Sequence, residues 1–196
     1  MVTKENVAII IPFHKNIEML RLSIHTLEES IIEEKPQIII IANNNDFDEV
    51  NLPKDEFDRY DVYKIPENLF WPGAINFGAH QTEKEYLLFC DPDLFYTEKW
   101  LDNLLDCYNQ HKNVGVVSAK IINPLNNRIM DFGMGYNHFN TIHIGKDLPA
   151  NHPSTLEDRK VQAACGAVFL TSHELFKRVN GIDTSMPYIY CDNDYS

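Results

Sequence analysis

The stretch LFCDPDLFY (88–96) places two acidic residues directly after an apolar run. Residues 87–90 are apolar throughout, which is typical of a strand covered on both faces. Asp91 and Asp93 follow at its carboxyl end, separated by a proline. In open α/β sheets, ligands bind just beyond the carboxyl ends of the strands. The two acids therefore indicate a ligand site if this strand belongs to such a sheet.

Apolar runs and helical patterns alternate along the first 122 residues. The pattern predicts strands, in chain order, at 7–13, 37–42, 60–66, 85–90 and 114–122. Between them, helices are predicted after Asn16, over 73–81 and after Thr97, with Asn16 and Thr97 as N-caps. This alternation predicts an α/β fold with a mostly parallel central sheet flanked by helices, and a Rossmann-like N-terminal half.

Polar or turn-forming residues stand at three of the predicted strand ends. These ends are Phe13 and His14, the ANNND stretch (42–46) and the DPD stretch (91–93). Because parallel neighbouring strands end at the same edge of a sheet, the three stretches are expected to converge on one rim.

The second part of the chain is less regular. The expected elements are a short hairpin strand, a long loop and a strand, at 128–136, 137–160 and 161–170. Ser172 is predicted to cap a short helix, as its residue type favours. The chain then reaches a second acid pair, Asp192 and Asp194.

The overall composition is that of one globular domain, residues 1–196. Apolar residues make up 44% of the chain, and the formal net charge is -12. Such a charge disfavours nonspecific binding to nucleic acid or to an anionic membrane. No run approaches the roughly 18 apolar residues of a transmembrane helix.

Four cysteines are spread along the chain without CxxC pairs, at Cys90, Cys107, Cys165 and Cys191. No Cys/His cluster has the spacing of common zinc sites. The sequence therefore predicts reduced thiols in a cytoplasmic protein.

Two carboxylates one residue apart on a turn can share a hard divalent cation. Mg²⁺ and Mn²⁺ prefer oxygen ligands and usually hold a substrate phosphate as well. For an isolated DPD stretch, a simple Asp-Pro turn is the more common interpretation. The position of Asp91 and Asp93 immediately after a buried strand favours the cation site.

Taken in order along the chain, several stretches resemble a known family. They are VAIIIPFHKN (7–16), IIIIANNND (38–46), ENLFWPGAINFGAH (67–80), YLLFCDPDLFYTEKWLDNL (86–104) and ACGAVFLTSHELFKRVNGIDTSMPYIYCDNDYS (164–196). Together they resemble family 2 inverting glycosyltransferases of the GT-A fold, particularly the bacterial type that builds surface polysaccharides. The resemblance implies a nucleotide-sugar-binding half at 1–122 and an acceptor-side half at 123–196.

The resemblance also implies roles for individual residues. Asp93 would bind the metal, Mg²⁺ or Mn²⁺, and Asp91 would contact the ribose or a metal-bound water. Asp192 would be the catalytic base, and Asp194 would lie on the acceptor side. The residues implied to line the nucleotide-sugar site are Pro12, Phe13, His14, Asn43, Asn44, Asn68, Gly73, Asn76, Asp91, Gly166 and Ala167.

The chain departs from the family pattern at three points. Ala42 and Asn43 stand where the second turn usually carries an aspartate, and Cys191 replaces the glutamate before the implied base. Most members also continue past the acidic cluster, whereas this chain stops at Ser196. The acceptor-side half therefore belongs either to a truncated piece of a longer protein or to a minimal enzyme.

The implied function is metal-dependent transfer of a sugar, with inversion, from a nucleoside-diphosphate sugar to a glycan or lipid-linked acceptor hydroxyl. A noncatalytic nucleotide-sugar or glycan-binding module is the main alternative. A sugar nucleotidyltransferase is a third, although PFHKN (12–16) lacks the glycine-rich basic loop that this class needs after its first strand. No nucleic-acid partner is expected, and peripheral association with a membrane stays open.

Overall fold

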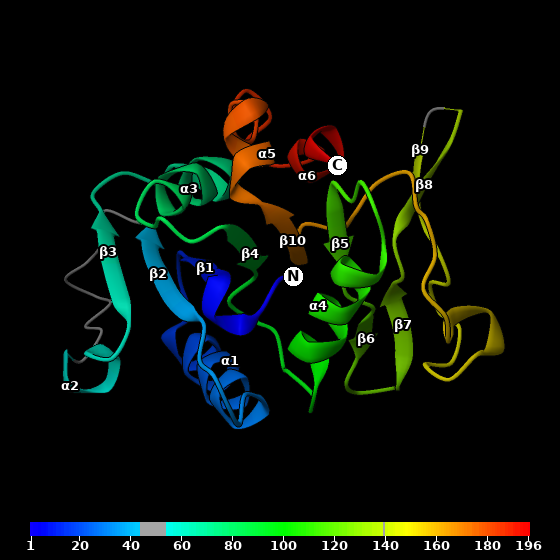
Figure 1. The fold of residues 1–196 in the computed structure, drawn as a ribbon, viewed down its shortest axis with the longest axis horizontal. Coiled ribbons are helices and arrows are strands. Elements are labelled where there is room, and N and C mark those ends of the chain that lie inside the picture. The colour runs from blue at the N-terminus through cyan, green and yellow to red at the C-terminus, as the bar shows by residue number, and fades with distance from the viewer. Residues whose placement is uncertain (44–53, 139) are drawn as a thin grey trace.

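Six strands form the central sheet, in the spatial order β3-β2-β1-β4-β10-β5 (Figure 1). The computed structural model describes residues 1–43, 54–138 and 140–196. The strands of this sheet are β1 (Val7–Phe13), β2 (Gln37–Asn43), β3 (Asp61–Ile65), β4 (Tyr86–Cys90), β5 (Val116–Ser118) and β10 (Val168–Ser172). Strand β1 pairs in parallel with β2 and β4, and β2 pairs in parallel with β3. Strand β10 is antiparallel to both of its neighbours, β4 and β5.

Helices cover both faces of the sheet, as the sequence predicts. They are α1 (Ile17–Ser30), α2 (Lys54–Phe57), α3 (Phe70–Ala79), α4 (Trp100–Gln110), α5 (His173–Arg178) and α6 (Cys191–Tyr195), with 3₁₀ turns η1 (Lys4–Asn6) and η2 (Pro153–Thr155). Helices α1 and α4 pack on one face, and α3, α5 and α6 on the other (Figure 1). Side chains of successive strand residues alternate between the two cores, with Ile9 in the first and Ile10 in the second.

The predicted N-caps agree with the structure at two of three positions, and the helix predicted at 73–81 begins earlier, at Phe70, and ends at Ala79. The side chain of Asn16 accepts a hydrogen bond from the backbone N–H of Met19, and Ser172 caps α5 in the same way. The prediction of Thr97 as a cap is wrong. Helix α4 begins three residues later, because the Thr97 carbonyl instead closes a turn by accepting from the backbone N–H of Trp100.

Two small hairpins lie beside the central sheet, so the second half of the chain contains more strands than the sequence predicts. They are formed by β6 (Ile121–Asn123) with β7 (Arg128–Asp131), and by β8 (Met134–Asn137) with β9 (Asn140–His143). The strand predicted at 114–122 is divided between β5 and β6, and the one predicted at 161–170 begins only at Val168. The loop predicted at 137–160 contains β9 and η2. Because both strands of the β8–β9 hairpin are largely exposed, they lack the apolar alternation that reveals a strand.

The parallel pairing of β1, β2 and β4 brings their carboxyl ends to one edge of the sheet. The ANNND stretch reaches this edge with its first two residues, and the remainder lies outside the described residues. Within the described parts of the chain, no helix is both long and apolar enough to cross a membrane.

Candidate active site

The dipeptide Gly166-Ala167 joins the two acidic regions that the sequence singles out. The carbonyl oxygen of Ala167 accepts a hydrogen bond of 2.9 Å from the backbone N–H of Asp91. The backbone N–H of Gly166 donates to Oδ2 of Asp192 over 2.8 Å. Three segments distant in the sequence therefore meet at one place, beyond the carboxyl end of β4.

Gly166 and Asp192 approach each other closely. A Cβ atom built at Gly166 would lie 3.0 Å from Cβ of Asp192 and 3.1 Å from its Oδ2. A side chain at position 166 would therefore require the Asp192 side chain to shift by a few tenths of an ångström. Asp192 itself lies in the first turn of α6, after Tyr190 in a left-handed conformation.

The Asp192 carboxylate is held at both oxygens. Oδ2 accepts from Gly166, and Oδ1 accepts from the backbone N–H of Asn193 over 2.9 Å. Each carboxylate oxygen has more than one acceptor position, so these bonds leave capacity for a further proton or hydroxyl group. The arrangement fixes the direction of the carboxylate and still permits it to act as a base. Asp194 is exposed, and its backbone N–H donates to the Tyr190 carbonyl.

Asp91 and Asp93 differ in their surroundings. Asp93 is exposed, whereas Asp91 is partly buried and its Oδ1 accepts a hydrogen bond of 3.0 Å from the indole Nε1 of Trp71. Burial raises the pKa of Asp91 to about 7, and the carboxylates of Asp93 and Asp192 add to this rise, which the Trp71 bond opposes. The three acids thus lie close enough to repel one another, and a cation between them would relieve that repulsion.

The donor set at Asp91 and Asp93 fits a hard divalent cation. Among the described residues, Asp91 and Asp93 have no third potential metal ligand of the protein close to both. In this part of the chain, a group of three such ligands within 4.8 Å of one another is found only elsewhere. Mg²⁺ and Mn²⁺ bound with a substrate do not need one, because water and phosphate oxygens complete their coordination. Two carboxylates at an open rim therefore suit an ion that also holds a phosphate.

Residues at the ends of β1 and β2 form a network that supports the rim. The Nδ1 atom of His14 lies 2.9 Å from the carbonyl oxygen of Asn43. The buried side chain of Asn43 donates to Asn68 Oδ1 and to the Phe70 carbonyl, and accepts from the Leu69 N–H. These bonds connect β2 to the start of α3. Both the nitrogen and the oxygen of the Asn43 side-chain amide are therefore already hydrogen-bonded to protein groups. The contact of Asn43 with a nucleotide stays a prediction.

The remaining predicted residues lie around this rim. Pro12 and Phe13 are buried at the end of β1, and Asn44 lies outside the described residues. Gly73 is in α3, where an added Cβ would come within 2.7 Å of Leu69 Cβ. The side-chain amide of Asn76 is bound by both backbone groups of Ile182, donating to the carbonyl over 2.8 Å and accepting from the N–H over 2.9 Å.

Three groups of polar residues are not predicted from the sequence. One is the Trp71 indole bond to Asp91. Another is the pair of buried Asp131 and half-buried His143, with Nδ1 and Oδ1 2.7 Å apart. The third is the cluster of Cys107, His111 and Asp158, whose ligand atoms lie within 4.8 Å of one another, the only group of this kind among the described residues. The sequence has no Cys/His cluster with the spacing of common zinc sites, and this cluster forms only because Asp158 comes from a distant part of the chain.

Comparison with known proteins assigns this chain to a family. The family profile "Glycosyl transferase family 2" matches residues 8–179. This match covers most of the chain, so the chain belongs to glycosyl transferase family 2. A comparison with curated protein sequences found no match.

A solved structure of similar fold is the mannosyltransferase PcManGT from Pyrobaculum calidifontis in complex with GDP-Man and Mn²⁺. The TM-score is 0.61 at 11% sequence identity, and the alignment covers 96% of this chain. The likeness therefore supports the GT-A fold. The chain spans about half the length of that enzyme, since the alignment covers 49% of it.

The hydrogen bond from Trp71 to Asp91 is expected to stabilise the fold and to orient the Asp91 carboxylate. Trp71→Phe keeps an aromatic ring against Phe89 and Phe169 but removes the indole donor. The free energy of unfolding should fall by about 1–3 kcal/mol, the cost of leaving a buried carboxyl without its donor. Because Asp91 loses its fixed orientation, Mn²⁺ affinity measured by calorimetry should fall as well.

Trp100→Phe is the matched control for this substitution. The Trp100 indole donates to the neutral Ser30 hydroxyl over 2.9 Å, away from the acids. This variant should lose some stability and keep the wild-type affinity for Mn²⁺. Equal Mn²⁺ affinity in Trp71→Phe and wild type would show that the indole does not orient Asp91 for a cation.

Proposed function

We propose that this chain transfers a sugar from a nucleoside-diphosphate sugar to an acceptor hydroxyl, with a divalent cation and with inversion at the anomeric carbon. The observation that carries this proposal is the Gly166-Ala167 link, which brings Asp192 to the rim that carries Asp91 and Asp93. Membership of glycosyl transferase family 2 supports the same reaction class. The proposed acceptor is a glycan or a lipid-linked sugar, as in the bacterial type that builds surface polysaccharides.

In this proposal, Asp93 and Asp91 hold Mg²⁺ or Mn²⁺ at the end of β4. When bound, the ion offsets the negative charge that develops on the departing nucleoside diphosphate. The chain has a formal net charge of -12, so a diphosphate needs such local compensation to bind here. The exposed carboxylate of Asp93 is the more accessible ligand, and Trp71 keeps Asp91 turned to the same rim.

Asp192 is the proposed general base. Its carboxylate takes the proton of the acceptor hydroxyl, whose oxygen then forms a bond to the anomeric carbon. The bond from that carbon to the diphosphate breaks, and its electron pair leaves with the phosphate oxygen. One displacement of this kind inverts the anomeric configuration. The bonds from Gly166 and Asn193 hold the carboxylate in one direction for this proton transfer.

The nucleotide is proposed to bind along the ends of β1 and β2 and the start of α3. His14, Asn43 and Asn68 form the supporting network there, and Pro12 and Phe13 shape the end of β1. The structurally similar enzyme was solved with GDP-Man, so that donor belongs in any test panel. Gly166 and Ala167 are proposed to form the floor of the donor-sugar site.

A panel of nucleotide sugars, GDP-Man among them, tests the proposed function. With Mn²⁺ present, one donor should raise the melting temperature of the wild-type protein and be hydrolysed slowly without an acceptor. Asp93→Ala should lose the part of this stabilisation that depends on Mn²⁺, because the exposed metal ligand is gone. Asp58→Asn, a change of an exposed acid in the turn after α2, is the charge control and should behave as wild type.

Other outcomes of the panel would contradict the proposal in distinct ways. Metal-dependent stabilisation without turnover, even with acceptors supplied, would indicate a noncatalytic binding module. Pyrophosphate release from a sugar phosphate and a nucleoside triphosphate would indicate a nucleotidyltransferase. Full stabilisation of Asp93→Ala by donor and Mn²⁺ would remove this residue from the metal site.

Asp192→Asn tests the base separately from donor binding. The amide cannot accept the proton, so transfer should fall at least about a hundredfold, within the range of general-base contributions. Donor affinity, measured by calorimetry with Mn²⁺, should change little because the side-chain volume is kept. Turnover that matches wild type would exclude Asp192 as the base.

A further inference from the structure

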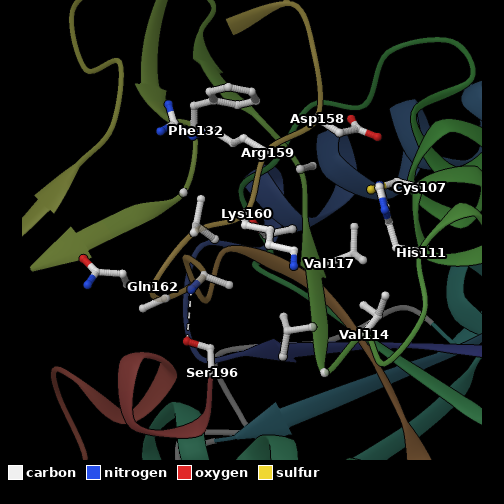
Figure 2. Close-up of a pocket in the computed structure, with 18 of the residues that line it drawn as sticks. Cys107, His111, Val114, Val117, Phe132, Asp158, Arg159, Lys160, Gln162 and Ser196 are labelled. Carbon is white, nitrogen blue, oxygen red and sulfur yellow. Dashed lines mark hydrogen bonds between the residues drawn. The ribbon is translucent and has the colours of Figure 1, made fainter.

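A cluster of three potential metal ligands lies outside the candidate active site. Ligand atoms of Cys107, His111 and Asp158 all lie within 4.8 Å of one another. They stand at one side of a cavity of about 660 Å³, which is also lined by Phe132, Lys160 and Ser196. Figure 2 shows Cys107 and His111 coming from the end of α4 and Asp158 coming from the chain segment that passes over the cavity.

The local structure explains why the three residues meet. Cys107 lies in the last turn of α4, and His111 is the C-cap residue one turn later. Their four-residue spacing puts both side chains on the same side of the helix end. The carbonyl end of an 11-residue helix carries partial negative charge, which favours a cation. Asp158 adds a carboxylate from a stretch without helix or strand, 156–162.

The chemistry of these ligands differs from that at Asp91 and Asp93. A thiolate, an imidazole and a carboxylate together suit Zn²⁺, whereas Mg²⁺ and Mn²⁺ prefer oxygen ligands alone. Zn²⁺ with ligands at about 2.0–2.3 Å would hold the three donor atoms roughly 3.5 Å apart. Because His111 and Asp158 are exposed and Cys107 is half-buried, small side-chain rotations reach this spacing.

Positive side chains also lie near the cluster, and that of Arg159 is turned towards Phe132. Lys112, Arg159 and Lys160 line the same cavity. The guanidinium of Arg159 lies 6.0 Å from the centre of the Phe132 ring and so is directed to the opposite side of the cavity from Cys107 (Figure 2).

We propose that Cys107, His111 and Asp158 bind a zinc-class cation that ties the end of α4 to segment 156–162. The remaining coordination position would be filled by water, as in three-ligand zinc sites. The tied segment continues into residues that the fold holds in place. The Gln162 and Ala163 N–H groups both donate to the Met134 carbonyl, and the Ala164 N–H donates to Ser196 Oγ. A bound ion would thus restrain the chain segment that leads to Gly166. The backbone N–H of Gly166 in turn binds the Asp192 carboxylate.

Cobalt binding tests this site with a spectroscopic signature. The purified chain, reduced and freed of metals with a chelator, is titrated with Co²⁺ alone. Wild type should develop thiolate-to-cobalt charge-transfer absorption and the visible bands of tetrahedral cobalt, and Zn²⁺ should abolish both. Cys107→Ser should lack the charge-transfer absorption. His111→Gln and Asp158→Asn, which alter exposed side chains, should weaken Zn²⁺ binding at least about tenfold.

Two controls separate this site from other thiols and from the donor-metal site. Cys165→Ser and Asp93→Ala should both keep the wild-type cobalt spectrum. This readout is independent of sugar transfer, so it stands even if the proposed function fails. Absence of charge-transfer absorption at saturating Co²⁺, or its persistence in Cys107→Ser, would overturn the proposal. Wild-type Zn²⁺ affinity in both His111→Gln and Asp158→Asn would overturn it as well.

Zinc should also stabilise the folded protein. The melting temperature of wild type should rise with added Zn²⁺, because an ion that binds only the folded state shifts the unfolding equilibrium. Hydrogen exchange over residues 158–166 should slow at the same time. Both changes should be clearly smaller in Asp158→Asn at the same Zn²⁺ concentration, and a Zn²⁺ effect of wild-type size in that variant would contradict the proposed tie.

Discussion

The candidate site depends on two backbone hydrogen bonds made by Gly166-Ala167, one to Asp91 and one to the side chain of Asp192. The antiparallel register of β10 against β4 places Gly166 and Ala167 where they can make these two bonds. Val168 pairs with Cys90, so the residues before Val168 lie beside those that follow β4. The absence of a side chain at Gly166 then lets the Asp192 carboxylate approach the backbone. A single reversed strand thereby brings the acidic end of the chain to the rim of a parallel sheet.

The two proposals together would separate two metal chemistries in space. The open rim at Asp91 and Asp93 offers oxygen ligands next to the proposed nucleotide-binding edge, as suits an ion that arrives with a diphosphate. The cluster around Cys107 offers sulfur and nitrogen ligands at the end of a helix on the other core. The first site would act in the reaction and the second would hold a segment in place. Their different ligand preferences allow each to be examined without the other.

The sequence predicts those parts of the fold that have strong local signals. The apolar runs at 7–13, 39–42 and 87–90 are continuous and buried, and the two acids follow one of them directly. The division between β5 and β6, at Ala119 and Lys120, is not predicted because apolar residues stand on both sides of this short break. The Trp71–Asp91 bond and the contribution of Asp158 to the Cys107 cluster join residues distant in sequence, so no local pattern reveals them. The resemblance to the family predicts a role for Asp192, whereas the hydrogen bond from Gly166 that orients its carboxylate is visible only in the structure.

The central claim is that the acids after β4 hold a divalent ion together with the phosphates of a nucleotide. Crystals of the chain grown with Mn²⁺ and a nucleoside diphosphate test it most directly, through the anomalous scattering of manganese. The account predicts one manganese peak at the carboxylate of Asp93, with phosphate oxygens on its other side and Asp192 facing the same space. A nucleotide bound elsewhere, or one bound at this rim with no manganese beside Asp91 and Asp93, would contradict it.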